Sequence, residues 1–277
     1  MRAGRDPRRR NRNIGTAKQG HGQNNRMTIP EAWADGRMYY ERLKEPVILV
    51  RGVWAHSIAF LVEPTHRGCV HACTVDDVVR MLEYLPQAHV IAIKTVVLRQ
   101  PTRKQGILNP CWGRLVYWAN IGRYSGTTIF LEAQEPDGGL RWNKSLDPAG
   151  TAELERLRVD GHRITETKRD YLIESSLNAI RATQLYRTVP HELGHYADYL
   201  ASVREPGRET ADLDEKARLE RAYASKPHQD KEAFAHRYAD EVRRQLIRER
   251  RIPFPRREER LRVGADGLTR AWFGSVP

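Results

Sequence analysis

Two histidines with three residues between them place the strongest constraint on this chain. Residues 191–195 read His-Glu-Leu-Gly-His. On an α-helix, residues four positions apart lie on one face, about 6 Å apart along the axis. His191 and His195 can therefore direct their rings at one point if this segment is helical. We predict a helix over residues 189–203, with Thr188 as its N-cap.

The residue types of this motif point to a metal ion. Neutral imidazoles are common ligands of Zn²⁺, and two of them on one helix face can share one ion. Glu192 would then lie beside the metal, where a carboxylate can hold a water molecule and take its proton. The motif therefore predicts a zinc-dependent hydrolase in which Glu192 is the general base.

A catalytic zinc usually has three protein ligands, so a third is expected downstream. Four side chains are candidates: Asp198, His228, Glu232 and His236. Residues 229–248 are predicted to form an amphipathic helix that packs its apolar residues against the first helix. Gly194 lowers the helix propensity of the motif by about 1 kcal/mol, and close packing at this point would explain its presence.

The first half of the chain is predicted to be rich in β-strands. Residues 46–64 read as a hairpin with its turn around Gly52. A capping box of Thr74 and Asp77 begins a helix, and Pro86 ends it. Three more strands are expected, over residues 90–98, 114–121 and 127–133. In the last of them, Ile129 and Leu131 should face one way and Phe130 the other.

The character of the chain changes near residue 150, after which helices are expected, one of them over residues 166–187. We therefore predict an α+β fold. Its expected parts are a disordered basic arm over residues 1–26, a β-rich subdomain with one helix over 27–150, and a helical subdomain with the zinc site over 151–277.

Composition excludes several classes of protein. The chain has 277 residues and a mean hydropathy of −0.67, with no apolar run of membrane-spanning length. No apolar stretch follows the Arg-rich start, so no signal peptide is expected. Three cysteines are too few for a disulfide framework. We expect a cytoplasmic protein with no membrane partner.

The motifs resemble those of a known group of enzymes. The run from His191 to Asp198, followed by Glu232-Ala-Phe-Ala, is similar to the gluzincin metallopeptidases, nearest the anthrax lethal factor type of catalytic domain. The resemblance covers about residues 74–248. It implies a zincin-like fold, in which a helix and a small mixed β-sheet with an edge strand precede the active-site helix and C-terminal helices.

The resemblance also implies roles for individual residues. His191, His195 and Glu232 would bind Zn²⁺, and Glu192 would be the general base of a metalloendopeptidase that acts on a protein or peptide. The strand over residues 127–133 would be the edge strand that pairs with an extended substrate, which makes four residues substrate-binding: Thr128, Ile129, Phe130 and Leu131.

A carboxylate is also favoured as the third ligand by its charge, because two neutral imidazoles leave Zn²⁺ with its full charge. Asp198 is too near His195 on the same helix to reach the open side of the metal. We expect Asp198 to accept the second ring N–H of a ligand histidine instead. His228 is expected in a loop after Pro227, where it would be poorly positioned.

The chain departs from the lethal factor type at one position. That group has a tyrosine seven residues before the ligand glutamate, where this chain has Ser225. Tyr223, His228 or His236 could stabilise the oxyanion in its place. We favour Tyr223 as this catalytic residue.

Two further patterns are open to interpretation. Residues 1–26 carry eight Arg or Lys against one Asp, and residues 243–262 carry nine Arg against three Glu. The alternative function is therefore a nucleic-acid-binding protein with a zincin-like structural body and basic ends, which would also suit an acidic surface. Cys69, His71, Cys73 and Cys111 could form a second zinc site, although buried free cysteines are the more common arrangement.

Overall fold

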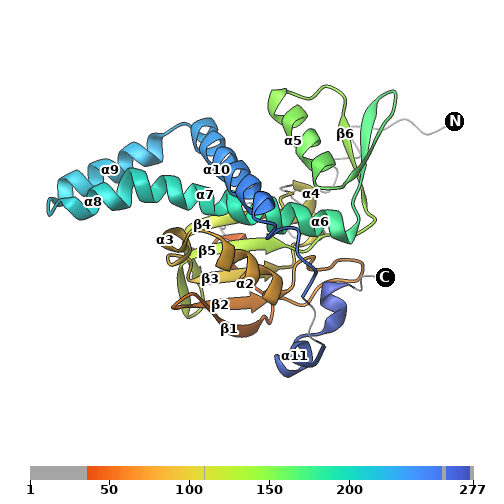
Figure 1. The fold of residues 1–277 in the computed structure, drawn as a ribbon, viewed down its shortest axis with the longest axis horizontal. Helices are drawn as coiled ribbons and strands as arrows, with labels where there is room; N and C mark the ends of the chain where they lie inside the picture. Colours follow the sequence, from red (N-terminus) through yellow and green to blue (C-terminus); the bar gives the residue numbers. More distant parts are fainter. Residues whose placement is uncertain (1–35, 109, 258–259, 275–277) are drawn as a thin grey trace, which may run out of the picture. The chain divides into compact units, whose positions relative to one another are not determined.

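The computed structural model describes residues 36–108, 110–257 and 260–274. Its centre is a five-stranded sheet in the order β1-β2-β3-β5-β4. β2, β3 and β5 run parallel, while β1 and β4 pair antiparallel with β2 and β5. Figure 1 shows the sheet with helices above it. The strands are β1 (Val47–Val53), β2 (His56–Val62), β3 (Thr95–Arg99), β4 (Gly113–Ile121) and β5 (Tyr124–Glu132).

The first hairpin and the first long helix are confirmed. β1 and β2 pair from Val47 with Val62 to Val53 with His56, so the turn lies two residues beyond Gly52. α2 (Val75–Tyr84) begins at a capping box in which Thr74 and Asp77 bind each other's backbone N–H groups. Both outcomes rest on local signals, namely β-branched alternation and a cap.

The strand expected over residues 90–98 is wrong in its first five residues. The chain forms a short helix, α3 (Gln87–Val90), and a turn before β3 begins at Thr95. Val90 and Ile93 are fully buried, as they would be in a strand. A short apolar run does not distinguish these two structures.

The larger core lies between the sheet and the helices that cover one face of it. Ile129 and Leu131 belong to this core, together with Leu193 of the predicted helix over residues 189–203. Phe130 faces the other side of the sheet and packs with Leu61. The predicted alternation of these three β5 residues is therefore confirmed.

A second, three-stranded sheet replaces part of an expected helix. Its order is β6-β8-β7, with β6 (Gly139–Asn143), β7 (Arg163–Glu166) and β8 (Asp170–Glu174). α5 (Pro148–Val159) precedes β7 and is capped by Asp147. The helix expected over residues 166–187 begins only at Leu177, after the N-cap Ser176. The apolar residues before it instead alternate along β8, where Ile173 is buried.

One long helical run crosses the sheet. It comprises α6 (Leu177–Thr183), a π-helical turn (Gln184–Thr188), α7 (Val189–Tyr199), a second π-helical turn (Leu200–Arg204) and α8 (Glu205–Glu209). Thr188 is therefore not an N-cap, because the helix continues through it and its hydroxyl donates to the carbonyl of Thr183. The remaining helices are α4 (Arg103–Leu108), α9 (Leu213–Ser225), α10 (His228–Arg248) and α11 (Arg260–Ala265), with 3₁₀ turns at Tyr39–Glu41 and Arg270–Phe273.

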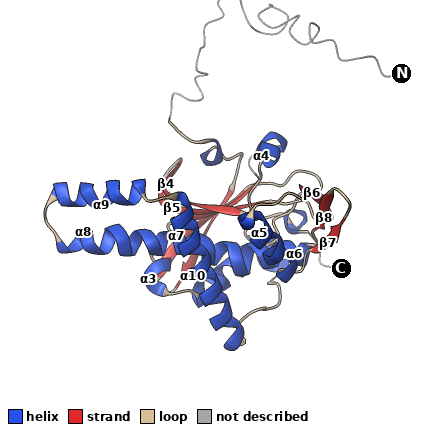
Figure 2. Ribbon diagram, turned by 90° about the horizontal axis from the view of Figure 1, so that it is seen from above, coloured by secondary structure: helices blue, strands red, loops and turns tan. Residues whose placement is uncertain are grey.

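Residues 39–277 form one compact unit. β6 pairs with β8 across residue 150, so this position does not separate a β-rich unit from a helical one. The α+β class is confirmed by the two sheets and the helices that follow and flank them (Figure 2). Residues 1–26, expected to be a basic arm, lie outside the described residues. Within the described residues, no helix combines the length and the apolar character needed to cross a membrane.

Candidate metal centre

α7 and α10 bring together three of the predicted ligands. The Nε2 atoms of His191 and His195 each lie 3.3 Å from an oxygen of Glu232. Among the described residues, these three side chains form the one group of at least three potential metal ligands whose donor atoms converge. The two distances run to different oxygens of Glu232, and one donor atom of each residue lies within 4.8 Å of the others. Two imidazoles and a carboxylate are a donor set that suits Zn²⁺, and these atoms lie close enough together to surround one ion.

A close approach of two helix backbones makes this geometry possible. A Cβ atom on Gly194 would lie 3.0 Å from Cα of Ala235 and 3.1 Å from its carbonyl oxygen. Ala235 is fully buried, three residues after Glu232 on α10. The predicted close packing at Gly194 is thus present, and it sets the distance between the two histidines and the glutamate.

The other third-ligand candidates lie near the cluster in different ways. His228 is the first residue of α10 and not part of a loop, and its Nε2 lies 3.4 Å from Glu232 Oε1. Its side chain is 87% exposed, so it reaches the cluster from solvent. The His236 ring packs on the ring of His191, with centroids 4.4 Å apart.

Glu192 lies beside the cluster and is held by the sheet. One of its oxygens accepts a hydrogen bond of 2.6 Å from the backbone N–H of Leu115 on β4. The side chain is buried, and burial raises its pKa, against the lowering effect of His191, His195 and that hydrogen bond. A carboxylate with a raised pKa beside a metal site is suited to taking and returning a proton.

The charges of the cluster shift the pKa values of its members. Hydrogen bonds from His191 and His195 hold the pKa of Glu232 well below its usual value. Burial lowers the pKa of His195, but the hydrogen bond to Glu232 and the nearby carboxylates raise it overall. Burial and the charge of His191 lower the pKa of His236 to about 4. His236 is therefore neutral at neutral pH.

Asp198 has a different partner from the one expected. Its two oxygens lie 2.7 and 2.6 Å from Nζ of Lys226, which follows α9. Asp198 is buried, and Lys226 is the C-cap residue of that helix. The ion pair joins α7 to the link between α9 and α10, so Asp198 acts on the position of the helix that carries Glu232.

Tyr223 is buried against α7 and does not face the cluster. Its hydroxyl lies 3.4 Å from the carbonyl oxygen of His195, which also accepts a hydrogen bond of 3.1 Å from Tyr117. The two hydroxyls are 3.0 Å apart. Tyr117, on β4, lines a cavity that opens on the cluster, whereas Tyr223 does not line it.

The prediction that residues 127–133 form the edge strand is wrong. β5 pairs with β3 on one side and with β4 on the other. The four expected substrate-binding residues are buried in this interior strand: Thr128, Ile129, Phe130 and Leu131. β4 lies at this edge of the sheet instead. After β3 the chain crosses over to form β4, and the hairpin then returns as β5 between β4 and β3.

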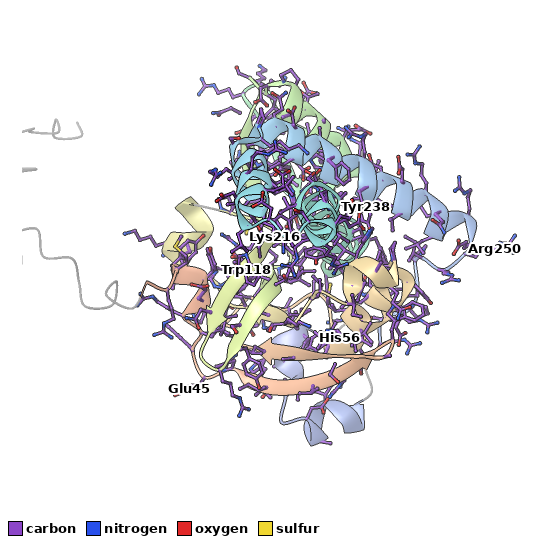
Figure 3. All side chains as sticks on the ribbon, turned by 90° about the vertical axis from the view of Figure 1, so that its left-hand side faces the viewer. Glu45, His56, Trp118, Lys216, Tyr238 and Arg250 are labelled. Carbon is purple, nitrogen blue, oxygen red and sulfur yellow. The ribbon has the colours of Figure 1, made fainter. Side chains whose placement is uncertain are left out.

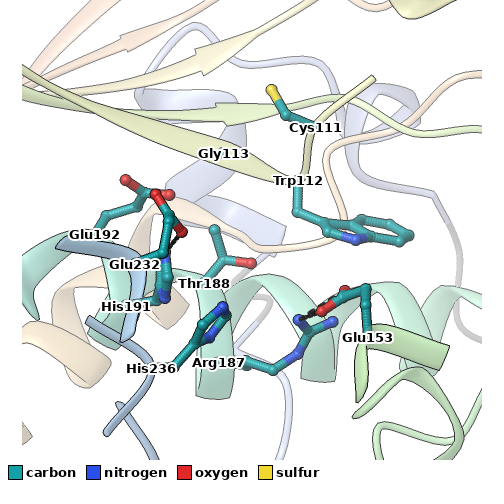
Figure 4. A pocket seen from close by; sticks show the side chains of 10 residues that line it. All are labelled: Cys111, Trp112, Gly113, Glu153, Arg187, Thr188, His191, Glu192, Glu232 and His236. Atoms are coloured by element: carbon teal, nitrogen blue, oxygen red, sulfur yellow. Dashed lines mark hydrogen bonds and ion pairs between the residues drawn. The ribbon is translucent and has the colours of Figure 1, made fainter. Parts of the chain in front are cut away.

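Among the described residues, two cavities open on the cluster along β4. One, of about 440 Å³, is lined by Leu115, Tyr117, His195, His228 and Lys231, among others. The other, of about 260 Å³, lies toward the start of β4. Figure 4 shows this second cavity, with Trp112 across from Arg187 and Glu153. Gly113, His191, Glu192 and Glu232 line both cavities.

Several residues that line these two cavities were not among the predicted site residues, because their sequence signals are weak. Gly113 begins β4, where a Cβ atom would lie 2.6 Å from the carbonyl oxygen of Phe130. Arg187 binds Glu153 and Asp160 and so joins α5 to the long helical run that contains α7. The Asp147-Pro148 start of α5 is a recognisable helix start, but nothing local connects it to Arg187.

The second zinc site has no support in the described residues. Cys69, Cys73 and Cys111 are free. His71 is buried, and its Nε2 lies 2.8 Å from the carbonyl oxygen of Glu63. Cys73 is buried, Cys69 and Cys111 are half-buried, and His71 has a hydrogen-bond partner, which is an ordinary arrangement of free thiols and a satisfied histidine.

Comparisons with protein-family models, with curated proteins and with solved structures give no match for this chain.

Proposed function

We propose that this protein is a zinc-dependent metallopeptidase with a zincin-like catalytic centre. The observation that carries the proposal is the convergence of His191, His195 and Glu232, whose donor atoms lie within 4.8 Å of one another, with Glu192 beside them. The edge strand β4 runs past the same point. A metal site, a buried carboxylate and an open strand edge together suit the hydrolysis of an extended peptide.

The edge of β4 supplies the means of holding a peptide backbone. The N–H of Leu115 points away from β5, because it reaches Glu192 across the cleft. In an antiparallel ladder the N–H and C=O of one residue point the same way, and alternate residues repeat that direction. The N–H of Leu115 is bound to Glu192, but its carbonyl and the backbone groups of Gly113 face outward and can pair with a substrate strand next to the cluster.

Each side chain then has a definite task. His191, His195 and Glu232 would hold the ion, which supplies a Lewis acid that acidifies water and polarises a carbonyl group. Glu192 would accept a proton from the attacking water and return it to the leaving amine. Tyr117 would donate to the developing oxyanion, since it lines the cavity beside His195.

The alternative function, nucleic-acid binding by basic ends, has less support. The arm over residues 1–26 is not described, and several arginines of the second basic segment are already bound. Arg243 pairs with Asp160, Arg251 pairs with Glu249, and Arg256 donates to the carbonyl oxygen of Phe273. Phosphate contacts need cations that are free to meet them.

The test combines metal content with hydrolysis. The purified protein should hold about one zinc per chain and should cleave an unstructured protein such as casein. Glu192→Gln should keep the zinc and lose about 10²–10⁴-fold in kcat, because an amide cannot accept the proton. A zinc-free protein, or a Glu192→Gln variant with near-normal turnover, would overturn the proposal.

A further inference from the structure

A third cavity continues the cleft beyond Tyr117. It has a volume of about 930 Å³ and is lined by α3, by the second half of β4 and by the helical run from α7 to α8. Tyr117 lines both this cavity and the one beside His195 and Glu232. Consecutive parts of β4 thus line the three cavities, and one extended chain along the edge strand could enter all of them.

Part of the wall of this cavity consists of large apolar side chains, two of which are exposed. Trp118 is 69% exposed and Ile91 is 51% exposed. Tyr196 and Leu200 form the buried side of the cavity. Figure 3 views the molecule from this side, with Trp118 labelled. Large apolar side chains that gather at an open cavity mark a binding surface more often than scattered ones do.

A bulge in β4 directs Trp118 into this position. The register shifts between Val116 and Ala119, so that Tyr117 and Trp118 lie opposite Thr127 alone. The Thr127 hydroxyl donates to the carbonyl of Tyr117 and fixes the bulge. Bulges commonly re-aim a side chain next to a functional site. Here the bulge allows two consecutive aromatic residues to line the same cavity.

The rim of the cavity is basic. Lys94, Arg204 and Arg208 line it, against a single acidic residue, Glu205. Within the described residues, neither Arg204 nor Arg208 forms an ion pair. A ligand with an apolar side chain flanked by carboxylates would complement both the wall and the rim.

We propose that this cavity is a remote substrate subsite that binds a large apolar side chain flanked by acidic residues. The inference rests on the proposed peptidase function, because the occupant is the same peptide that pairs with β4. Trp118 lies three to five residues along the strand from Leu115 and Gly113. At about 3.3 Å per residue, the anchor side chain therefore lies about three to five residues from the scissile bond.

Binding is measured first, so that the result does not depend on catalysis. The zinc-loaded Glu192→Gln protein is titrated with fluorescein-labelled, unstructured peptides of about 12 residues. Each carries Asp-Phe-Asp at one end, on the N-terminal or the C-terminal side of a randomised stretch. One of these two peptides should bind about tenfold more tightly than its match with Ser in place of Phe.

The variants assign this preference to the cavity. Trp118→Ala should abolish the preference for Phe, and Trp54→Ala, which removes another exposed tryptophan from the turn between β1 and β2, should not change it. Arg208→Glu should weaken binding of the acidic peptide and favour a match with Lys-Phe-Lys. With the wild-type protein, cuts should fall about three to five residues from the anchor.

The possible outcomes separate the two proposals. Hydrolysis that ignores both the anchor and Trp118 would overturn the subsite and leave the peptidase function standing. Anchor binding that needs Trp118, without hydrolysis by the zinc-loaded wild-type protein, would overturn the peptidase function but leave the cavity as a peptide-binding site. Tighter Trp118-dependent binding of oligo(dT) than of either peptide would assign the cavity to single-stranded nucleic acid and overturn the inference.

Discussion

Gly194 and Ala235 bring α7 and α10 so close together that a single added Cβ atom would lie 3.0 Å from the Cα of Ala235. Few Cβ atoms lie this close to a neighbouring backbone, so Ala235 would have to give way by a few tenths of an ångström. His191 and His195 flank Gly194, and Glu232 lies three residues before Ala235. The geometry of the proposed metal centre therefore depends on the close packing at position 194.

The first prediction follows from this contact. Gly194→Ala should lower the free energy of unfolding by about 1–3 kcal/mol and should weaken zinc binding, because α10 must shift away. Urea titration and a zinc competition assay measure the two effects. Gly106→Ala is the matched control, since its added Cβ atom meets nothing within 4 Å and it lies in the helix α4. Unchanged zinc affinity in Gly194→Ala would contradict this account.

The second prediction separates Glu232 from His228. Glu232→Ala should lower zinc affinity by orders of magnitude, because only two of the three protein ligands remain. His228→Ala should leave the zinc bound, because its ring is largely exposed and lies 3.4 Å from an oxygen of Glu232. Metal content by mass spectrometry distinguishes them. A metal-free His228→Ala protein with zinc retained in Glu232→Ala would replace the assignment by a three-histidine site.

The third prediction concerns the ion pair of Asp198 and Lys226. Both Asp198→Asn and Lys226→Met should destabilise the protein and weaken zinc binding by similar factors, because each breaks the link between α7 and the start of α10. A double-mutant cycle should give a coupling of about 0.5–3 kcal/mol. If Asp198→Asn alone weakens zinc binding, Asp198 acts on a ligand histidine, as the sequence motif suggested.

The fourth prediction compares two tyrosines. The carbonyl oxygen of His195 accepts hydrogen bonds from the hydroxyl groups of both Tyr117 and Tyr223. Tyr223 can therefore keep its hydrogen bond when the Tyr117 hydroxyl turns to the substrate. Burial and the hydrogen bond with Tyr223 raise the pKa of Tyr117, which keeps its hydroxyl protonated as a donor. Tyr117→Phe should lower kcat about 10²–10³-fold, and Tyr223→Phe much less. A larger loss in Tyr223→Phe would restore that residue as the oxyanion donor.

The fifth prediction is a pH dependence of stability. Burial lowers the pKa of His71 from 6.5 to about 4. The folded protein favours the neutral ring, so this contribution is present above pH 6.5 and is lost as the pH falls toward 4. At pH 5 the loss is about 2 kcal/mol.

Urea unfolding at pH 7 and pH 5 measures this loss. His71→Gln, which cannot titrate, should lose less stability over this interval than the wild-type protein. The exposed His66→Gln should behave like the wild type. An equal loss in His71→Gln would assign the pH dependence to other groups, such as His162, whose pKa is also lowered by burial.

The sequence by itself determined the elements whose causes are local. The capping box of Thr74 and Asp77, the hairpin of β1 and β2 and the helical spacing of His191 and His195 depend on residues a few positions apart. A cap, a turn and a helix face are each complete within one or two turns of chain. Such features can be predicted without knowledge of the fold.

Only the tertiary structure decided which strand is the edge, which residue pairs with Asp198 and which tyrosine faces the cleft. β5 has the sequence of a strand in either position, and it is interior because β3 pairs with it across a crossover. Lys226 reaches Asp198 because α9 folds back against the π-helical turn and α8 that follow α7. These relationships depend on the packing of segments far apart in the chain, where many pairings suit the same local pattern.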